Sequence, residues 1–148
     1  MARKFPLQPL LDLAQNHMDS AAKNLQALKA RWNDAEDKLR QLLAYRESYR
    51  ERLRESGGNG TSAMALRDFQ LFLAKLDAAI KLQQDEVARC QARWNAGQQE
   101  WLKQRGKLKA FDTLSQRHRR AEEKRENQIE QKEQDELSRK QSDRSGEE

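Results

Sequence analysis

The amino-acid sequence predicts an all-α fold in which two long helices pair as an antiparallel coiled-coil hairpin, with the second helix longer and overhanging. Three observations lead to this prediction. Charged residues make up 36% of the chain, and its two prolines, Pro6 and Pro9, lie at the very start, as is typical of long helices. Apolar residues recur at alternating steps of three and four along two segments. A glycine-rich stretch separates these segments.

The first segment carries a heptad pattern from Leu11 to Leu53. Twelve of its thirteen positions are apolar or aromatic, and Arg46 is the exception. Such a sustained pattern predicts a helix whose apolar stripe faces a partner helix. We call the thirteen positions seam 1: Leu11, Ala14, Met18, Ala21, Leu25, Leu28, Trp32, Ala35, Leu39, Leu42, Arg46, Tyr49 and Leu53.

A chain reversal is predicted where seam 1 ends. Gly57, Gly58 and Gly60 surround Asn59, and glycine readily adopts the backbone angles that a reversal requires. Thr61 or Ser62 can cap the helix that follows, because a hydroxyl oxygen accepts a hydrogen bond from a free backbone N–H.

The heptad pattern resumes after the reversal, and eleven of its fourteen positions are apolar. Cys90 lies among them and is expected to be a small buried hydrophobe. Folding the chain about Asn59 places Leu25 near Trp94 and Ala21 near Gly97. We call these positions seam 2: Leu66, Phe69, Leu73, Leu76, Ile80, Gln83, Val87, Cys90, Trp94, Gly97, Trp101, Gln104, Leu108 and Phe111.

The same pattern predicts how the chain is divided. After Phe111 the positions at this spacing become polar, while the sequence still favours a helix. The predicted parts are a flexible N-terminus (1–9), helix one (10–55), a Gly-rich turn (56–61), helix two paired with helix one (62–111), an overhanging charged helix (112–141) and a disordered tail (142–148).

Enzymatic function is not predicted. The two histidines, His17 and His118, are far apart, and neither a zinc-ligand spacing around Cys90 nor a phosphate-binding glycine loop is present. We therefore expect no catalytic residue, no cofactor and no metal. A single cysteine and the lack of a long apolar run favour a cytoplasmic protein without direct membrane insertion.

Apolar side chains outside the two seams suggest a surface for a protein partner. They cluster near the predicted turn, and exposed Leu and Phe contribute little to a two-helix coiled coil. The alternative is a wider seam whose flanks neighbouring side chains partly cover. The off-seam apolar residues are Leu43, Tyr45, Leu71, Phe72 and Leu82.

Several segments together resemble the FliJ family, and the resemblance covers almost the whole chain. Along the predicted second helix, the resemblance continues at Trp101, Leu108, Phe111, Leu114 and residues 131–136. The segments that carry most of it are residues 42–50 (LLAYRESYR), 58–60 (GNG) and 69–80 (FQLFLAKLDAAI).

This resemblance implies a non-catalytic component of the bacterial flagellar type III protein export apparatus, and hence a role in motility. It implies a stalk held in the ring of the export ATPase hexamer, with further contacts to export chaperones and to the cytoplasmic part of the export-gate membrane protein. The expected location is cytoplasmic, peripheral to the inner membrane at the flagellar base. By position, the gate-contacting residues are Leu42, Tyr45, Tyr49, Phe72, Leu76 and Ala79.

Three alternatives remain open at the level of the sequence. One is the equivalent stalk protein of a virulence injectisome. Another is a basic coiled-coil rod that binds nucleic acid or a membrane surface, because the chain carries a net charge of +5. Acidic residues interrupt the basic ones, however, so nucleic acid is not the expected partner. The third is a structural coiled coil that dimerises through its off-seam apolar residues.

Overall fold

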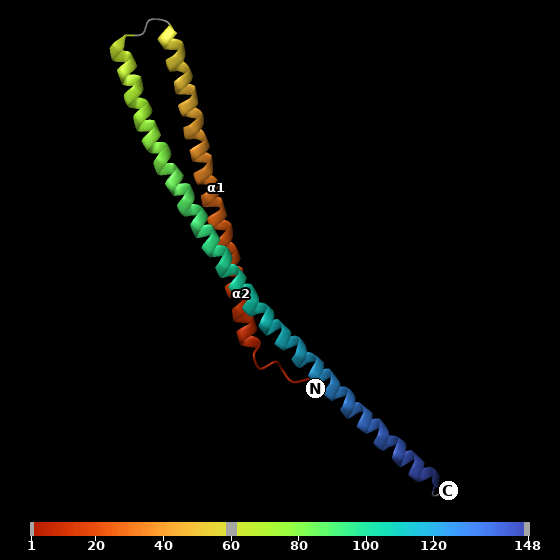
Figure 1. The fold of residues 1–148 in the computed structure, drawn as a ribbon. Coiled ribbons are helices and arrows are strands. Elements are labelled where there is room, and N and C mark those ends of the chain that lie inside the picture. The colour runs from red at the N-terminus through yellow and green to blue at the C-terminus, as the bar shows by residue number, and fades with distance from the viewer. Residues whose placement is uncertain (1, 59–61, 147–148) are drawn as a thin grey trace. The chain divides into compact units, whose positions relative to one another are not determined.

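The computed structural model of the chain describes residues 2–58 and 62–146, and it contains two long helices packed against each other (Figure 1). Helix α1 spans Gln8–Gly58 and helix α2 spans Ala63–Gly146. Within the described ranges there is no β-strand. The predicted all-α hairpin is confirmed.

Helix α1 begins two residues earlier than the sequence predicts. The backbone N–H of Gln8 donates to the carbonyl of Phe5 at 3.1 Å, which forms a turn immediately before the helix. Pro9 is tolerated at the second helical position, because backbone N–H groups in the first turn have no partner within the helix.

Helix α2 begins at a serine cap. Ser62 Oγ accepts a hydrogen bond from the backbone N–H of Ala65 at 3.2 Å, as expected for an N-cap residue. The centre of the predicted Gly-rich turn, residues 59–61, lies outside the described part of the chain. At its other end α2 continues through residues 142–146, which the sequence suggests are disordered, and residues 147–148 are not described.

The chain divides into two compact units, one formed by Ser20–Leu102 and the other by Met1–Asp19 with Lys103–Glu148. In the first unit, seam residues of both helices supply the core: Ala35, Leu76, Ile80 and Cys90 are all 5–7% exposed. Gln83, a polar interruption of seam 2, donates from Nε2 to the carbonyl of Ala35 at 2.9 Å. Its amide N–H is thereby satisfied by the partner helix.

Cys90 is buried in the seam, as expected. Burial raises the pKa of its thiol above the usual value, and a hydrogen bond from the thiol to Glu86 acts in the same direction. A buried thiol with a raised pKa is a poor nucleophile. Its environment is therefore that of a packing residue.

The tryptophans do not pair as the simple fold about Asn59 suggests. Trp94 lies against Trp32, with ring centroids 5.4 Å apart, and Lys29 Nζ lies 4.1 Å from the centroid of Trp32. A methyl group added at Gly97 would meet Leu28 Cδ1 at 2.6 Å and Leu25 Cδ1 at 3.6 Å, so leucines occupy the place expected for Ala21. Gly97 therefore allows these large side chains to approach α2, and the observed neighbours lie one to two turns along α1 from the expected ones.

The second unit has a thinner core. Ala14 is 6% exposed, and Leu11, Leu108 and Phe111 are half-buried. Partial burial continues beyond the predicted end of seam 2, at the polar residues Ser115, His118, Glu122 and Arg125. From residue 127 to residue 146 every residue of α2 is exposed.

Neither α1 nor α2, over the residues described, contains a segment apolar enough to cross a membrane.

Two glycines of α2 provide a test of the packing. Gly106→Ala should raise the free energy of unfolding by about 0.5–1 kcal/mol, because alanine favours a helix and nothing lies within 4 Å of the added methyl group. Gly97→Ala should raise the free energy of unfolding by less, because the side chain of Leu28 must move to admit the methyl group. Chemical denaturation followed by circular dichroism measures both changes. Equal gains would contradict the close approach at Gly97.

Candidate protein-interaction surface

Four aromatic side chains from both helices form one cluster, which we call the aromatic cluster: Tyr45, Tyr49, Phe69 and Phe72. Tyr49 is its centre, with its ring centroid 4.4 Å from that of Phe72, 5.1 Å from that of Phe69 and 6.4 Å from that of Tyr45. Tyr45 also meets Phe72 nearly edge-on, at 6.1 Å and an interplanar angle of 71°. These separations are in the range of favourable aromatic pairs, each of which contributes about 0.5–1.5 kcal/mol beyond area burial.

The heptad pattern explains why these rings meet. Tyr45 directly precedes the seam residue Arg46, and Phe72 directly precedes the seam residue Leu73. Each ring therefore lies on the same flank of its own heptad stripe, and the antiparallel pairing brings those flanks together. Ala79 occupies the equivalent position one heptad after Phe72. We call the surface formed by Tyr45, Phe72 and Ala79 the aromatic edge.

The side chains of Tyr45 and Phe72 are exposed to solvent, and ring contacts hold both of them in place. Tyr45 is 49% exposed and Phe72 is 36% exposed, although both contact the half-buried Tyr49. Ring contacts restrict the side chains before any partner arrives, so binding orders fewer rotamers. Aromatic side chains held in this way are suited to be anchors of a protein interface.

The structure separates the residues predicted to contact the gate into two groups. Tyr45, Phe72 and Ala79 lie on the aromatic edge, with Tyr49 beneath it. Like Tyr49, the other two are seam residues: Leu42 is half-buried and Leu76 is only 7% exposed.

The additional off-seam residues do not form one patch. Leu43 directly follows the seam residue Leu42, so it lies on the flank of α1 opposite Tyr45. Leu71 and Leu82 are 57% and 68% exposed, and their heptad positions lie on the side of α2 that faces away from α1. These three leucines are thus exposed, as predicted, but on other surfaces.

An ion pair lies on the flank opposite the aromatic edge. Arg46 Nε is 2.8 Å from Asp77 Oδ1, and Asp77 directly follows the seam residue Leu76. This pairing accounts for the one charged residue of seam 1. Arg46 stays partly exposed, with 31% of its side chain accessible, so its charge is not fully desolvated.

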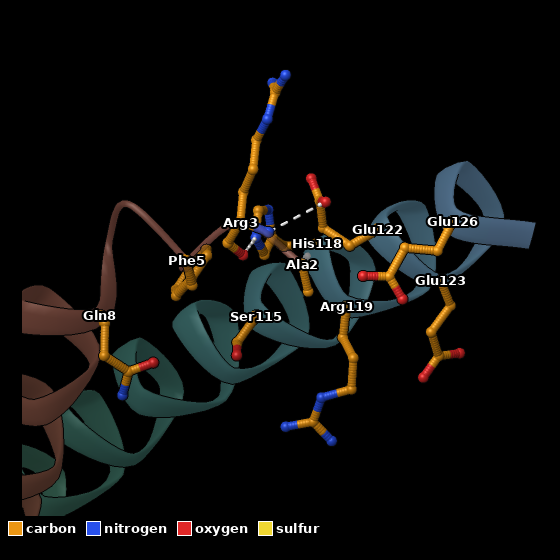
Figure 2. A pocket seen from close by; sticks show the side chains of 10 residues that line it. All are labelled: Ala2, Arg3, Phe5, Gln8, Ser115, His118, Arg119, Glu122, Glu123 and Glu126. Carbon is orange, nitrogen blue, oxygen red and sulfur yellow. Dashed lines mark hydrogen bonds between the residues drawn. The ribbon is translucent and has the colours of Figure 1, made fainter. Parts of the chain in front are cut away.

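A second surface, which the sequence does not predict, lies in the unit formed by residues 1–19 and 103–148 (Figure 2). Residues before α1 lie along α2. The backbone N–H of Arg3 donates to Glu122 Oε2 at 3.2 Å, and His118 Nε2 donates to the carbonyl of Arg3 at 2.8 Å. The rings of Phe5 and His118 are 5.6 Å apart. The sequence pattern gave no signal for these contacts, because polar side chains of α2 bind backbone groups, which carry no signature in the sequence.

The described residues include no group of three or more His, Cys, Asp or Glu side chains placed to hold a metal ion.

Leucine substitutions distinguish core from surface near the aromatic cluster. Leu76→Ala should lower the free energy of unfolding by about 2–4 kcal/mol, because it leaves a cavity in the seam. Leu82→Ala should change it by less than about 0.5 kcal/mol, because that side chain is 68% exposed. Urea denaturation of both variants measures the difference. Similar losses in the two variants would contradict the assignment of Leu76 to the core.

The fold and the two seams define the chain as an α-helical hairpin protein of the coiled-coil class. A family model described as "Flagellar FliJ protein" matches residues 3–147. The chain belongs to this FliJ family, and membership makes it a component of flagellar protein export.

Two relatives are similar over most of their length. The flagellar FliJ protein of Salmonella typhi is 29% identical over 117 residues, and that of Escherichia coli strain K12 is 26% identical over 117 residues. In both comparisons the aligned region covers 79% of this chain and 80% of the relative. The resemblance inferred from the sequence is confirmed at the level of the family.

Proposed function

We propose that this chain is a non-catalytic, cytoplasmic stalk of the flagellar type III export apparatus, peripheral to the inner membrane at the flagellar base. In this proposal it sits in the ring of the export ATPase hexamer and contacts the export gate and the export chaperones. The observation that carries the contact with the gate is the aromatic edge, where Tyr45 and Phe72 are exposed yet fixed by Tyr49.

The composition of the aromatic edge suits a protein partner. Its aromatic rings offer large apolar area at a small cost in conformational entropy, while Ala79 leaves room one heptad further along α2. A partner that presents an apolar pocket or a small amphipathic surface would cover both rings. The cytoplasmic part of the gate protein is the proposed partner. Family membership supports the flagellar system over an injectisome.

Coupling between the ATPase and the gate follows from binding at two places. If the hairpin binds one gate conformation more tightly than another, then occupancy of the aromatic edge shifts the gate between these states. The ATPase would then act on the gate by changing how the hairpin offers its aromatic edge to the gate. This mechanism requires no chemical step on the hairpin.

A double substitution tests the contact with the gate. Tyr45→Ala with Phe72→Ala should weaken binding to the purified cytoplasmic part of the gate protein by about tenfold or more, because truncating aromatic anchors removes most of an interface's affinity. Isothermal titration calorimetry measures the affinity. Circular dichroism checks that the helices remain intact.

The matched control removes as much exposed apolar surface from a different face. Leu71→Ala with Leu82→Ala alters the side of α2 that points away from α1, so binding to the gate should stay within about twofold of the unsubstituted chain. An unchanged affinity in the Tyr45 and Phe72 variant would refute the aromatic edge as the gate contact. A loss in the control alone would move the contact to the outer face of α2.

A further inference from the structure

We propose that the face of α2 around His118 and Glu122 is a binding site for an extended peptide with a basic residue two positions before an aromatic residue. The N-terminal segment of this chain, residues 2–5, is its resident ligand. A segment of the same chemistry, supplied by another molecule, competes for the site.

Two side chains of α2 hold the backbone of the N-terminal segment. His118 and Glu122 are four residues apart, so they lie on one face of the helix. One donates to the carbonyl of Arg3 and the other accepts from its N–H, at 2.8 Å and 3.2 Å. Both main-chain polar groups of one residue are therefore held by side chains of α2. Such contacts do not depend on the identity of the held side chain, which is how an extended peptide is bound in general.

Selectivity comes from the surroundings of these two hydrogen bonds. The ring of Phe5 contacts the ring of His118, which favours an aromatic residue two positions after the held backbone. The groove occupies about 410 Å³, and Figure 2 shows the carboxylates of Glu122, Glu123 and Glu126 along it, with Arg119 nearby. More acidic than basic side chains of α2 line the groove, so it favours a peptide with positive charge. Arg3 carries that charge and acts electrostatically on Glu122, while its guanidinium points away from α2 in Figure 2.

The described residues of the resident segment, 2–5, are largely exposed. Ala2, Arg3 and Lys4 are exposed, and only Phe5 is half-buried. Glu122, by contrast, pairs with Arg125 of its own helix at 3.2 Å, and 12% of its side chain stays accessible with the segment in place. The helix side of the site is thus preformed, while the segment that fills it can exchange.

A spin label at the N-terminus tests whether residues 2–5 occupy the site. The full chain carries Ala2→Cys as the labelling position and Cys90→Ala to remove the native thiol. Paramagnetic broadening should appear at the backbone amides of residues 115–126. Glu122→Ala should reduce it, because the acceptor for Arg3 is lost. Glu130→Ala, an exposed glutamate outside the groove, is the matched control and should leave the broadening unchanged.

A free peptide then tests binding by another molecule. The tethered segment competes at an effective concentration of about 1 mM, so the peptide Ala-Arg-Lys-Phe-Pro-Leu is added at several times that concentration. Broadening at residues 115–126 should fall as the peptide displaces the segment. The same peptide with alanine in place of phenylalanine should need up to about tenfold more for the same effect. Absence of broadening in the labelled chain, or broadening that resists the peptide, overturns the proposal.

Acid should release the resident segment. The pKa of Glu122 is lowered from its usual value of 4.5, chiefly because it accepts a hydrogen bond from the backbone N–H of Arg3. Docking is therefore favoured above that value and is lost as the pH falls through the lowered pKa. The charged groups around it are Arg3 on the segment and, on α2, His118, Arg119, Glu123, Arg125 and Glu126.

The same label measures this pH dependence. Broadening at residues 115–126 should decline as the pH falls below about 4.5, while helicity stays constant. Glu122→Gln should abolish the decline, because its amide does not titrate over this range. A decline of equal size in Glu122→Gln would contradict the role of Glu122.

Discussion

The apolar seam between α1 and α2 is the constraint on which the other features of this molecule depend. It is a thin core, because two helices enclose only a stripe of side chains. The most buried apolar residues, Ala14, Ala35, Leu76, Ile80 and Cys90, are still 5–7% exposed. A linear core of this kind spreads its stabilisation along the chain, so no single layer dominates. It also leaves both flanks and both outer faces open to solvent, and these are the surfaces on which a partner can act.

Small and polar residues shape the seam as much as large apolar ones. Gly97 admits Leu25 and Leu28 close to α2, while Gln83 and Arg46 stay in the seam because each finds a partner on the other helix. The ion pair of Arg46 and the aromatic cluster occupy opposite flanks of the same stretch. One flank of this stretch therefore carries an ion pair, and the other carries aromatic rings. This asymmetry gives the hairpin two chemically different sides.

The sequence predicted the stripe well, because heptad spacing depends on local geometry alone. Arg46 and Gln83 kept their seam positions despite their polarity, since position in the repeat decides which way a side chain points. The observed neighbours of Trp94 and Gly97 lie one to two turns along α1 from those expected, because packing between helices depends on side-chain size as well as spacing. The prediction of one partner surface grouped Leu43, Leu71 and Leu82 with Tyr45 because all four are apolar or aromatic residues outside the seams. Their positions in the repeat separate them, and that signal was present in the sequence.

The contacts of the N-terminal segment were beyond such reasoning for a different physical reason. A heptad repeat predicts which face of a helix is buried only where apolar residues occupy its positions. After Phe111 these positions hold the polar residues Ser115, His118 and Glu122. His118 and Glu122 bind backbone groups of Arg3, and a backbone group carries no signature in the sequence. The polar character of His118 and Glu122 also distinguishes the contacts of the N-terminal segment from those of the seam. An apolar stripe holds its partner helix through buried area and excludes water. The described residues 2–5 are held instead by hydrogen bonds to the backbone of Arg3 and a ring contact of Phe5, which fix the orientation of the segment. The first arrangement suits a permanent scaffold, and the second suits a ligand that leaves.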